Sequence, residues 1–256
     1  MGLLTGKKAV IFGVVNEKSI AWAIAEAFKR EGAELALTYA NETVAKRVNP
    51  LARSIGAELV LPCDVQSDAE IKAVFGEIDK TWGGLDILVH SVAFANKEEL
   101  KGSFLNTTRE GFAMALDISA YSLVALVKEA ASLMQGRQGS VLTMSYYGGQ
   151  KVFPNYNVMG VAKAALEACV RYLAETLGPD GTRVNAISAG PLKTLAAAGV
   201  GGFNQIASHV AEKAPLRRNI TQEEVAGAAL YLCSSLAKGV TGEIHFVDNG
   251  YNVIGL

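Results

Sequence analysis

The sequence predicts an α/β protein, folded as a single domain around a doubly wound parallel sheet of about seven strands with helices on both faces. Short apolar segments alternate with longer helical patterns along the 256 residues. Each apolar segment is unbroken, which is typical of strands covered on both faces. No Pro/Ser-rich linker, repeat or low-complexity stretch interrupts this alternation, so one domain is expected over residues 1–256.

The predicted strands are rich in β-branched and large apolar residues. In chain order they are KKAVIFG (7–13), ELALTY (34–39), ELVLPCD (58–64), LDILVHS (85–91), SVLTMS (140–145), RVNAIS (183–188) and EIHFVDNG (243–250). The helices predicted between them include SIAWAIAEAFKREG (19–32), DAEIKAVFGEIDKTWG (68–83) and MGVAKAALEACVRYLAETLG (159–178). Each of these three segments ends at glycine, the residue type that most often caps a helix C-terminus.

Composition and charge narrow the class of partner. Half of the residues are apolar and the formal net charge is -1, which argues against a nucleic acid or a charged membrane surface as partner. No segment reaches the roughly 18 uninterrupted apolar residues of a membrane span, and MGLLTGKKAVIFG lacks the regions of a secretory signal. Cys63, Cys169 and Cys233 show no disulfide or CxxC pattern, and no spacing suggests a metal site. A cytoplasmic protein without a metal is expected.

The first strand is followed by the pattern expected of a phosphate-binding turn. In such a sheet, ligands bind beyond the carboxyl ends of the strands, near the switch in strand order. Gly13 is suited to the tight turn, and Ser19 and Ile20 open the next helix, whose free N–H groups would hold a pyrophosphate. A single glycine before a polar loop also occurs in ordinary strand–helix connections. The position directly after the first strand favours a Rossmann-like dinucleotide site.

Two further strand ends carry candidates for the cofactor. In PCDV, Asp64 would accept a hydrogen bond from the adenine amine and Val65 would pack on its ring. The alternative is that Asp64 only caps the helix that begins near SDAEIK. In HSVAFA, small side chains let a flat ligand approach the backbone, or serve packing alone. The residues predicted there are Ser91, Val92 and Ala93 for the cofactor and Ala95 for the ligand beside it.

The end of the second strand bears on the choice between NADH and NADPH. A carboxylate at this place binds the ribose diol, whereas a basic group takes a 2′-phosphate. Neither follows at once, because Ala40 and Asn41 come first, then Glu42, with Lys46 and Arg47 about one helical turn beyond. NADH is therefore predicted, and NADPH remains the alternative if Lys46 or Arg47 reaches the site.

The segment YNVMGVAK points to redox chemistry with an unusual spacing. Many nicotinamide dehydrogenases carry a tyrosine four residues before a lysine on one helix, but Met159 holds that position here and the nearest phenol is Tyr156. On one helix, a separation of seven residues places Tyr156 and Lys163 within roughly 20° of the same face and about 10.5 Å apart. Lys163 would then reach the nicotinamide ribose and favour the phenolate form of the tyrosine.

The displaced phenol suggests conjugate addition. Reduction of a ketone adds hydride to the carbon that bears the oxygen, whereas reduction of an α,β-unsaturated thioester adds it two bonds away. The carbonyl oxygen then lies further from the nicotinamide, where a phenol one turn away can stabilise the enolate. The alternative is that Tyr156 is simply a core residue.

These segments together resemble one family, the enoyl-acyl-carrier-protein reductases of the short-chain dehydrogenase/reductase superfamily. The resemblance runs through GKKAVIFGVVNEKSIAWAIA, DILVHSVAFA, SYYGG, YNVMGVAKAALEA, RVNAISAGPLKTLAA and VTGEIHFVDNGY, and covers nearly the whole chain. Its most specific part is the six-residue gap between Tyr156 and Lys163, with SYY before it. The chain departs from the family pattern at Asn96, where proline is common, and in TYANE (38–42), where relatives carry glutamine.

The resemblance implies reduction of trans-2-enoyl-acyl-carrier-protein thioesters by NADH, in fatty acid elongation, by a homotetramer. It implies that Tyr156 assists at the substrate carbonyl and that Lys163 binds the cofactor ribose, with Tyr146 as the second active-site tyrosine. The implied cofactor contacts are Gly13, Ser19, Ile20, Asp64, Val65, Lys163 and, in the LKTLA segment, Leu192, Thr194 and Ala196.

A substrate-binding loop is predicted near 192–210. Pro191 stops the preceding strand, and the Gly/Ala-rich run 196–202 has little side-chain bulk to fix it, as in a lid that closes over bound ligands. A mobile surface loop is the alternative from composition alone, and the resemblance favours a role in binding. The predicted substrate contacts are Ala95, Tyr146, Tyr156, Met159, Phe203 and Ile206.

Three functions therefore stand as hypotheses. The first is the NADH-dependent enoyl reductase. The second is a carbonyl (3-ketoacyl) reductase of the same superfamily, which Met159 in the usual tyrosine position disfavours. The third is a non-catalytic dinucleotide-binding regulator, which would not need the Tyr156–Lys163 pair.

Overall fold

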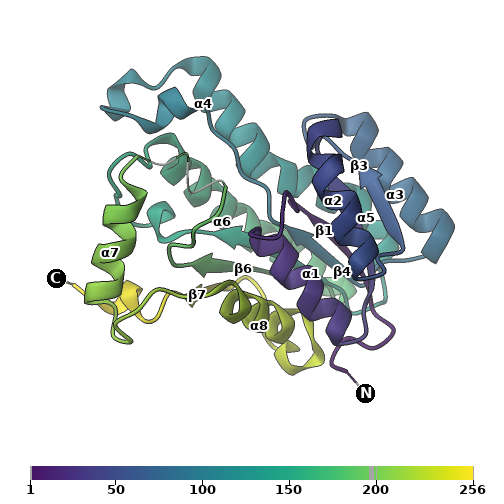
Figure 1. The fold of residues 1–256 in the computed structure, drawn as a ribbon. Coiled ribbons are helices and arrows are strands. Elements are labelled where there is room, and N and C mark those ends of the chain that lie inside the picture. Colours follow the sequence, from purple (N-terminus) through teal and green to yellow (C-terminus); the bar gives the residue numbers. More distant parts are fainter. Residues whose placement is uncertain (1, 196–198, 200, 256) are drawn as a thin grey trace.

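A seven-stranded parallel sheet forms the centre of the molecule (Figure 1). The computed structural model describes residues 2–195, 199 and 201–255. Within them the strand order is β3-β2-β1-β4-β5-β6-β7, and every neighbouring pair is parallel. The strands are β1 (Lys8–Phe12), β2 (Glu34–Tyr39), β3 (Leu59–Pro62), β4 (Ile87–His90), β5 (Ser140–Ser145), β6 (Arg183–Ala189) and β7 (Ile244–Val247). All seven lie within the segments predicted from the sequence to about one residue, so the predicted fold class is confirmed.

Helices cover both faces of the sheet. They are α1 (Ile20–Arg30), α2 (Glu42–Ser54), α3 (Asp68–Trp82), α4 (Arg109–Leu116), α5 (Ser122–Met134), α6 (Val158–Leu177), α7 (Phe203–Lys213) and α8 (Gln222–Cys233). One apolar core joins the sheet to α1, α2 and α8, and a second core joins its other face to α3, α5 and α6. In Figure 1, α4 and α7 stand out from this layered body.

The strand order reverses between β1 and β4, which locates the ligand crevice. After β3 the chain crosses the sheet, so the carboxyl ends of β1 and β4 lie side by side, with Phe12 paired to His90. Gly13 follows with a φ of 101°, and a Cβ at this position would lie 2.1 Å from the carbonyl oxygen of Ser91. Only glycine therefore allows the two strand ends to meet.

A π-helical turn shapes the segment between α4 and α5. Asp117–Tyr121 forms this turn and buries Ser119. The Ser119 hydroxyl accepts a hydrogen bond from the N–H of Phe94 (3.0 Å) and lies 3.1 Å from its carbonyl oxygen, so it fixes the segment that follows β4. The continuous helical stretch Arg109–Met134 is long and apolar enough to cross a membrane by length and composition, but half of its most apolar window is buried inside the protein, as in a core helix.

Two of the predicted helix ends differ from the structure. Gly83 caps α3 in the left-handed conformation, with a φ of 63°, as predicted. Gly178 after α6 has a φ of -55° and instead continues into a short 3-10 turn, and the left-handed residue is Gly181. The start of α6 at Val158 leaves Tyr156 outside the helix, because Asn157 precedes it with a φ of 39°.

Candidate active site

The connection from β1 to α1 has the features of an anion site. Ser19 is buried, and its hydroxyl accepts hydrogen bonds from the N–H groups of Val15 and Asn16 (both 3.0 Å) and donates to the Asn16 carbonyl (2.7 Å). The hydroxyl therefore holds the loop and does not cap α1, which begins at Ile20 as predicted and has no acidic residue in its first turn. The free N–H groups of that turn suit a phosphate.

Asp64 and Val65 lie at the end of β3, beside the predicted adenine position. Asp64 is exposed, and its carboxylate accepts from the Gln66 N–H (3.0 Å). The cap of α3 is Ser67, which accepts from the N–H of Glu70. The alternative reading of Asp64 as a helix cap is therefore wrong.

The residues that follow β4 are open to a ligand on one side. Ser91 and Val92 are half-buried, Ala93 is exposed, and Phe94 is 48% exposed although it is a large apolar side chain. Because Ser119 binds the backbone of Phe94, this segment presents a fixed edge next to Gly13. Contact of these residues with a flat ligand stays a prediction.

The end of β2 offers no cation next to the strand. Asn41 caps α2, where its side chain accepts from the Val44 N–H (3.1 Å). Glu42 opens α2, and Lys46 and Arg47 are exposed on that helix. In the structure, as in the sequence, no basic side chain follows β2 directly, which is the observation behind the prediction of NADH.

Lys163 is a buried cation at the centre of the site. Its side chain on α6 is only 5% exposed, and its Nζ donates to the carbonyl oxygen of Met144 at the end of β5 (2.7 Å). Burial disfavours the charged form and lowers the pKa of Lys163 to about 8, although the negative charge of Glu167 acts in the opposite direction. The lysine is therefore largely protonated at neutral pH and loses its charge at mildly alkaline pH.

The two tyrosines predicted at the site are in contact. The rings of Tyr146 and Tyr156 stand edge to face, with centroids 4.9 Å apart and an interplanar angle of 67°. Gly148 makes this possible, because a Cβ there would lie 2.5 Å from Cδ1 of Tyr156 and 2.9 Å from Cδ1 of Tyr146. The structure thus brings Tyr146, Tyr156 and the helix of Lys163 together.

Tyr156 does not share a helix with Lys163, contrary to the prediction, because α6 begins at Val158. Tyr156 lies in a turn before α6, between two asparagines with left-handed backbones, Asn155 (φ 63°) and Asn157 (φ 39°). Asparagine is one of the few residue types that adopt this conformation readily. The side-chain amide of Asn157 donates to the carbonyl oxygen of Glu99 (3.2 Å), which fixes the turn. This turn, and not a seven-residue helical repeat, places the phenol.

Lys163 was expected to favour the phenolate form of Tyr156, but it is not among the groups that shift the pKa of this phenol. Burial raises the pKa of Tyr156 far above its usual value, and Tyr146 and Glu167 raise it further. The pKa of Tyr146 is raised as well, first by burial and then by Tyr251. Both phenols are therefore protonated at neutral pH.

An apolar cluster adjoins Tyr156. Its buried members are Leu100, Ala115, Val158, Met159 and Ala162, and Ala95, Leu116 and Tyr156 pack against it. Three predicted substrate contacts, Ala95, Met159 and Tyr156, thus lie in one cluster. Met159 is 6% exposed, so the position where a carbonyl reductase would carry its tyrosine is occupied by a buried thioether.

Comparison with known proteins decides the family. The family model described as Enoyl-(Acyl carrier protein) reductase matches residues 13–252. The chain belongs to this family. It is 53% identical to an enoyl-acyl-carrier-protein reductase (NADH) of Aquifex aeolicus, over 100% of this chain and 95% of that protein.

Solved structures of family members have the same fold. An enoyl-acyl-carrier-protein reductase of Anaplasma phagocytophilum in complex with NAD superposes with a TM-score of 0.96 at 51% identity, over 100% of this chain and 97% of that chain. The Bacillus cereus reductase with NADP+ and an indole naphthyridinone gives a TM-score of 0.97 at 52% identity, over 100% of both chains. The predicted family and fold are thus confirmed.

The predicted substrate-binding loop of this reductase is only partly a loop. Leu192 packs against the core, and the N–H of Thr194 donates to its carbonyl oxygen (2.9 Å). The predicted contact at Ala196 lies outside the described residues. Helix α7 begins at Phe203, so the second half of the segment 192–210 is helical.

Phe203 and Ile206 do not join the tyrosine pair. Ile206 lines a cleft of about 790 Å³ between the 151–155 segment, α7 and the C-terminal segment 251–255, and the tyrosine that lines this cleft near β5 is Tyr147. Phe203 is half-buried at the first turn of α7. The amide of Asn155 donates to the carbonyl oxygen of Gly201 (3.1 Å), which links the turn of Tyr156 to the segment before α7.

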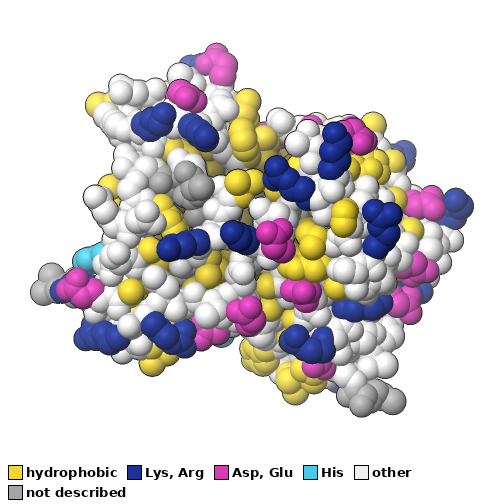
Figure 2. Space-filling model, in the orientation of Figure 1, with side chains coloured by type: hydrophobic (Ala, Val, Ile, Leu, Met, Phe, Trp, Pro, Cys, Tyr) yellow, Lys and Arg dark blue, Asp and Glu magenta, His cyan; other side chains and the backbone are white. Residues whose placement is uncertain are grey.

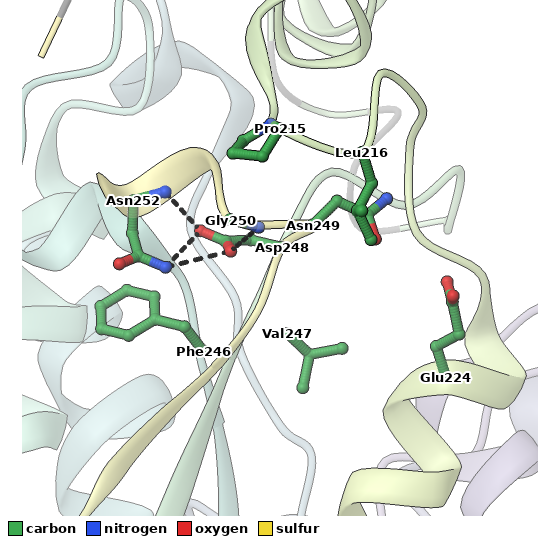
Figure 3. Close-up of a pocket in the computed structure, with 9 residues that line it drawn as sticks. All are labelled: Pro215, Leu216, Glu224, Phe246, Val247, Asp248, Asn249, Gly250 and Asn252. Atoms are coloured by element: carbon green, nitrogen blue, oxygen red, sulfur yellow. Dashed lines mark hydrogen bonds between the residues drawn. The ribbon is translucent and has the colours of Figure 1, made fainter. Parts of the chain in front are cut away.

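A smaller cavity, of about 470 Å³, lies at the carboxyl end of β7 (Figure 3). Asp248 is buried beside it and accepts hydrogen bonds from the Gly250 N–H and from the backbone and side chain of Asn252. The carboxylate is fully occupied in holding this turn. None of the site residues predicted within the described part of the chain lines the cavity.

One surface of the reductase is hollowed between the α4 region and the body (Figure 2). Hydrophobic side chains are exposed along the hollow and Lys and Arg side chains stand at its border. In the described part of the chain, no group of three or more His, Cys, Asp or Glu side chains is arranged to hold a metal ion.

The sequence did not single out the residues that position the site residues without themselves being candidates for ligand contact. Asn157 and Gly148 shape the surroundings of the tyrosines and Ser119 fixes the backbone of Phe94, and nothing in their identity alone distinguishes them. Glu167 is different, because it lies four residues after Lys163 on an otherwise apolar helix face and is 4% exposed. That spacing could have singled it out.

Proposed function

We propose that this chain reduces the carbon–carbon double bond of trans-2-enoyl-acyl-carrier-protein thioesters in fatty acid elongation, by hydride transfer from NADH. The reaction agrees with the family and with the relatives named as NADH-dependent reductases. One observation supports the roles proposed for individual residues: Tyr156 contacts Tyr146 beside the helix of Lys163. Met159, in the position of the usual tyrosine, is buried in the apolar cluster.

The residues present fit a dinucleotide. Gly13 lets β1 and β4 meet without an intervening side chain, α1 presents an uncapped N-terminus, and Lys163 offers a buried cation. In the proposed arrangement the pyrophosphate lies at Ser19–Ile20, the adenine at Asp64–Val65 and the nicotinamide ribose at Lys163. Ser91, Val92, Ala93, Leu192 and Thr194 complete the proposed contacts. When bound, NADH supplies the hydride to the β-carbon of the substrate.

Tyr156 is proposed to stabilise the negative charge that develops on the thioester oxygen. Its raised pKa keeps the hydroxyl protonated, so it donates a hydrogen bond to that oxygen. A donor aimed at a developing oxyanion in a site of low polarity is worth several kcal/mol, on the order of 3 kcal/mol in acyl-transfer enzymes. Tyr146 supports the ring of Tyr156, and the α-carbon receives its proton from solvent.

The acyl chain is proposed to lie against Ala95, Met159 and Tyr146, with the segment 192–210, including Phe203 and Ile206, as the substrate-binding segment. The bond from Asn155 to Gly201 supports this proposal, since it connects the turn of Tyr156 to that segment. The proposed substrate is a thioester of acyl carrier protein, and the proposed assembly is a homotetramer. The protein is proposed to be cytoplasmic, in agreement with its three free cysteines, and to bind neither nucleic acid nor membrane.

The assay that tests this function follows NADH absorbance with a crotonyl thioester and, separately, with a 3-ketoacyl thioester. Consumption with the enoyl substrate alone is expected. Consumption with the ketone alone would identify the carbonyl reductase, and consumption with neither would identify the non-catalytic regulator. Light scattering on a sizing column tests the tetramer independently.

A further inference from the structure

Glu167 is a buried carboxylate whose hydrogen-bond donors are both uncharged. Its side chain on α6 is 4% exposed, and within the described residues no lysine or arginine lies within ion-pair distance of it. Burial of an unpaired carboxylate is costly, so such a group usually serves a specific purpose. Its two oxygens accept from the Ser145 hydroxyl (2.6 Å) and from the Gln150 amide (3.1 Å).

These two donors flank the turn that carries Tyr146. Ser145 is the last residue of β5 and directly precedes Tyr146, while Gln150 follows the short 3-10 turn Tyr147–Gly149. One turn earlier on α6, Lys163 donates to the carbonyl oxygen of Met144. Two residues of one helix, four positions apart, therefore hold both ends of the segment 144–150.

The backbone of this segment is packed tightly against α6 and the tyrosines. A Cβ at Gly149 would lie 3.1 Å from the backbone of Lys163 and 3.2 Å from Oε1 of Glu167. A Cβ at Gly160 would lie 2.8 Å from the carbonyl oxygen of Gly148, whose own missing Cβ faces both tyrosine rings. A shift of the segment relative to α6 would therefore move Tyr146 against Tyr156.

We propose that Glu167 is a positioning residue for the reduction, which clamps the Tyr146 turn onto the helix of Lys163 and places a negative charge one helical turn from that lysine. This inference deepens the proposed function and rests on it. A glutamine of the same shape could accept from Gln150 and donate to the Ser145 hydroxyl, but it would carry no charge.

The second part of the proposal is supported by the groups around Glu167. Its charge raises the pKa of Lys163 against the effect of burial and adds to the raised pKa of Tyr156. His90 at the end of β4 also interacts with Lys163, and burial keeps this histidine neutral by lowering its pKa to about 3. Removal of the Glu167 charge therefore leaves Lys163 without a nearby anion among these groups.

The test compares Glu167→Gln with Glu175→Gln, an exposed glutamate on the same helix. In Glu167→Gln, kcat with NADH and a crotonyl thioester is expected to fall about tenfold to a hundredfold, as small misplacements of reacting groups do. The pH at which the affinity for NADH declines is expected to move below that of the wild type. Glu175→Gln is expected to match the wild type in both measurements. A merely structural role would lower the melting temperature without moving the pH profile.

Two results would overturn the inference: wild-type kcat together with a wild-type pH profile in Glu167→Gln, or equal effects of the two glutamine variants. If Glu167→Gln does not fold, Ser145→Ala serves in its place, because it removes one hydrogen-bond donor and leaves the carboxylate. A lowered kcat at unchanged NADH affinity would support the clamp, and a wild-type kcat would refute it. An inactive wild type would refute the proposed function itself, which separates the two failures.

Discussion

The ring of Tyr146 stands edge-on to the ring of Tyr156, with centroids 4.9 Å apart, and the missing side chain of Gly148 makes room for both. The contact orients Tyr156 without using its hydroxyl. The hydroxyl is thus left for a substrate oxygen, and its contribution can be separated from that of the ring.

Tyr156→Phe keeps the ring contact and removes only the donor. We expect kcat with a crotonyl thioester to fall about a hundredfold or more, as for loss of one oxyanion donor, while the dissociation constant for NADH stays at the wild-type value. Turnover is measured by NADH absorbance and binding by NADH fluorescence. Tyr172→Phe, at an exposed position on α6, is the control. Full turnover in Tyr156→Phe would show that the phenol has no part in the reaction.

Lys163 predicts a pH dependence of cofactor binding. Burial lowers its pKa to about 8, so its positive charge is present below that pH and is lost as the pH rises through it. We expect the affinity for NADH to weaken between about pH 7 and pH 9, and the change to be absent in Lys163→Ala, which binds NADH weakly at every pH. Fluorescence titrations across this range measure it, with the exposed Lys128→Ala as control. A flat wild-type profile would contradict the assignment.

The role of Gly13 in the turn after β1 can be tested by an alanine substitution, with the same substitution at Gly76 in α3 as its control. Gly13→Ala places a methyl group against the Ser91 carbonyl at a φ of 101° and is expected to destabilise the protein by about 3 kcal/mol and to weaken NADH binding. Gly76 lies in α3 with nothing within 4 Å of its Cβ position, so Gly76→Ala is expected to stabilise by about 0.5–1 kcal/mol. Urea denaturation measures both, and equal effects would disprove the special role of Gly13.

Cofactor preference is testable at α2. We expect kcat/KM to be higher with NADH than with NADPH, because no cation adjoins the end of β2. The exposed Lys46 and Arg47 are the only basic groups in that first stretch of α2. The double variant Lys46→Ala/Arg47→Ala is expected to lower kcat/KM for NADPH and to leave the value for NADH unchanged. Equal losses with both cofactors would mean that these side chains do not distinguish the 2′-phosphate.

Asp86 predicts acid sensitivity away from the site. Burial alone would raise the pKa of its carboxyl, but the Lys8 N–H, Arg137 and Lys7 together lower it below the ordinary value of 3.8. The resulting stabilisation is full above that value and is lost as the pH falls through the lower pKa of the folded state. Asp86→Asn is expected to cost about 2 kcal/mol at pH 7 and to make stability less dependent on pH below 4. Denaturation at pH 7 and pH 3.5 measures this, and activity at pH 7 is expected to persist.

The sheet could be read from the sequence because each strand is buried on both faces, which leaves unbroken apolar runs such as the one in β4. The start of α6 could not. The apolar pattern around Tyr156 fits a helix, but Asn155 and Asn157 adopt left-handed conformations that a local periodicity does not reveal. The start of α7 at Phe203 was not foreseen either, since the Gly/Ala-rich run before it suggested a loop that extends to residue 210.

The protonation of the site residues was harder to predict from the sequence than their identity. Tyr146 and Tyr156 are in contact beside the helix of Lys163, but burial, Tyr146 and Glu167 raise the pKa of the Tyr156 phenol, so it is protonated at neutral pH. Burial of a particular side chain is a property of the assembled fold. The same holds for Glu167, whose neighbours Ser145 and Gln150 lie far from it in sequence.

The meeting of Gly13 with the Ser91 carbonyl limits how this reductase can be redesigned. No larger side chain fits at the crossing of β1 and β4 without forcing the strands apart, so selection for a different nucleotide has little freedom there. The junction of β2 and α2 is the permissive place, since Asn41 and Glu42 are exposed and their side chains can be exchanged without touching either core. Libraries aimed at altered coenzyme use should therefore vary the exposed residues Asn41, Glu42, Lys46 and Arg47 and leave the glycine turn intact.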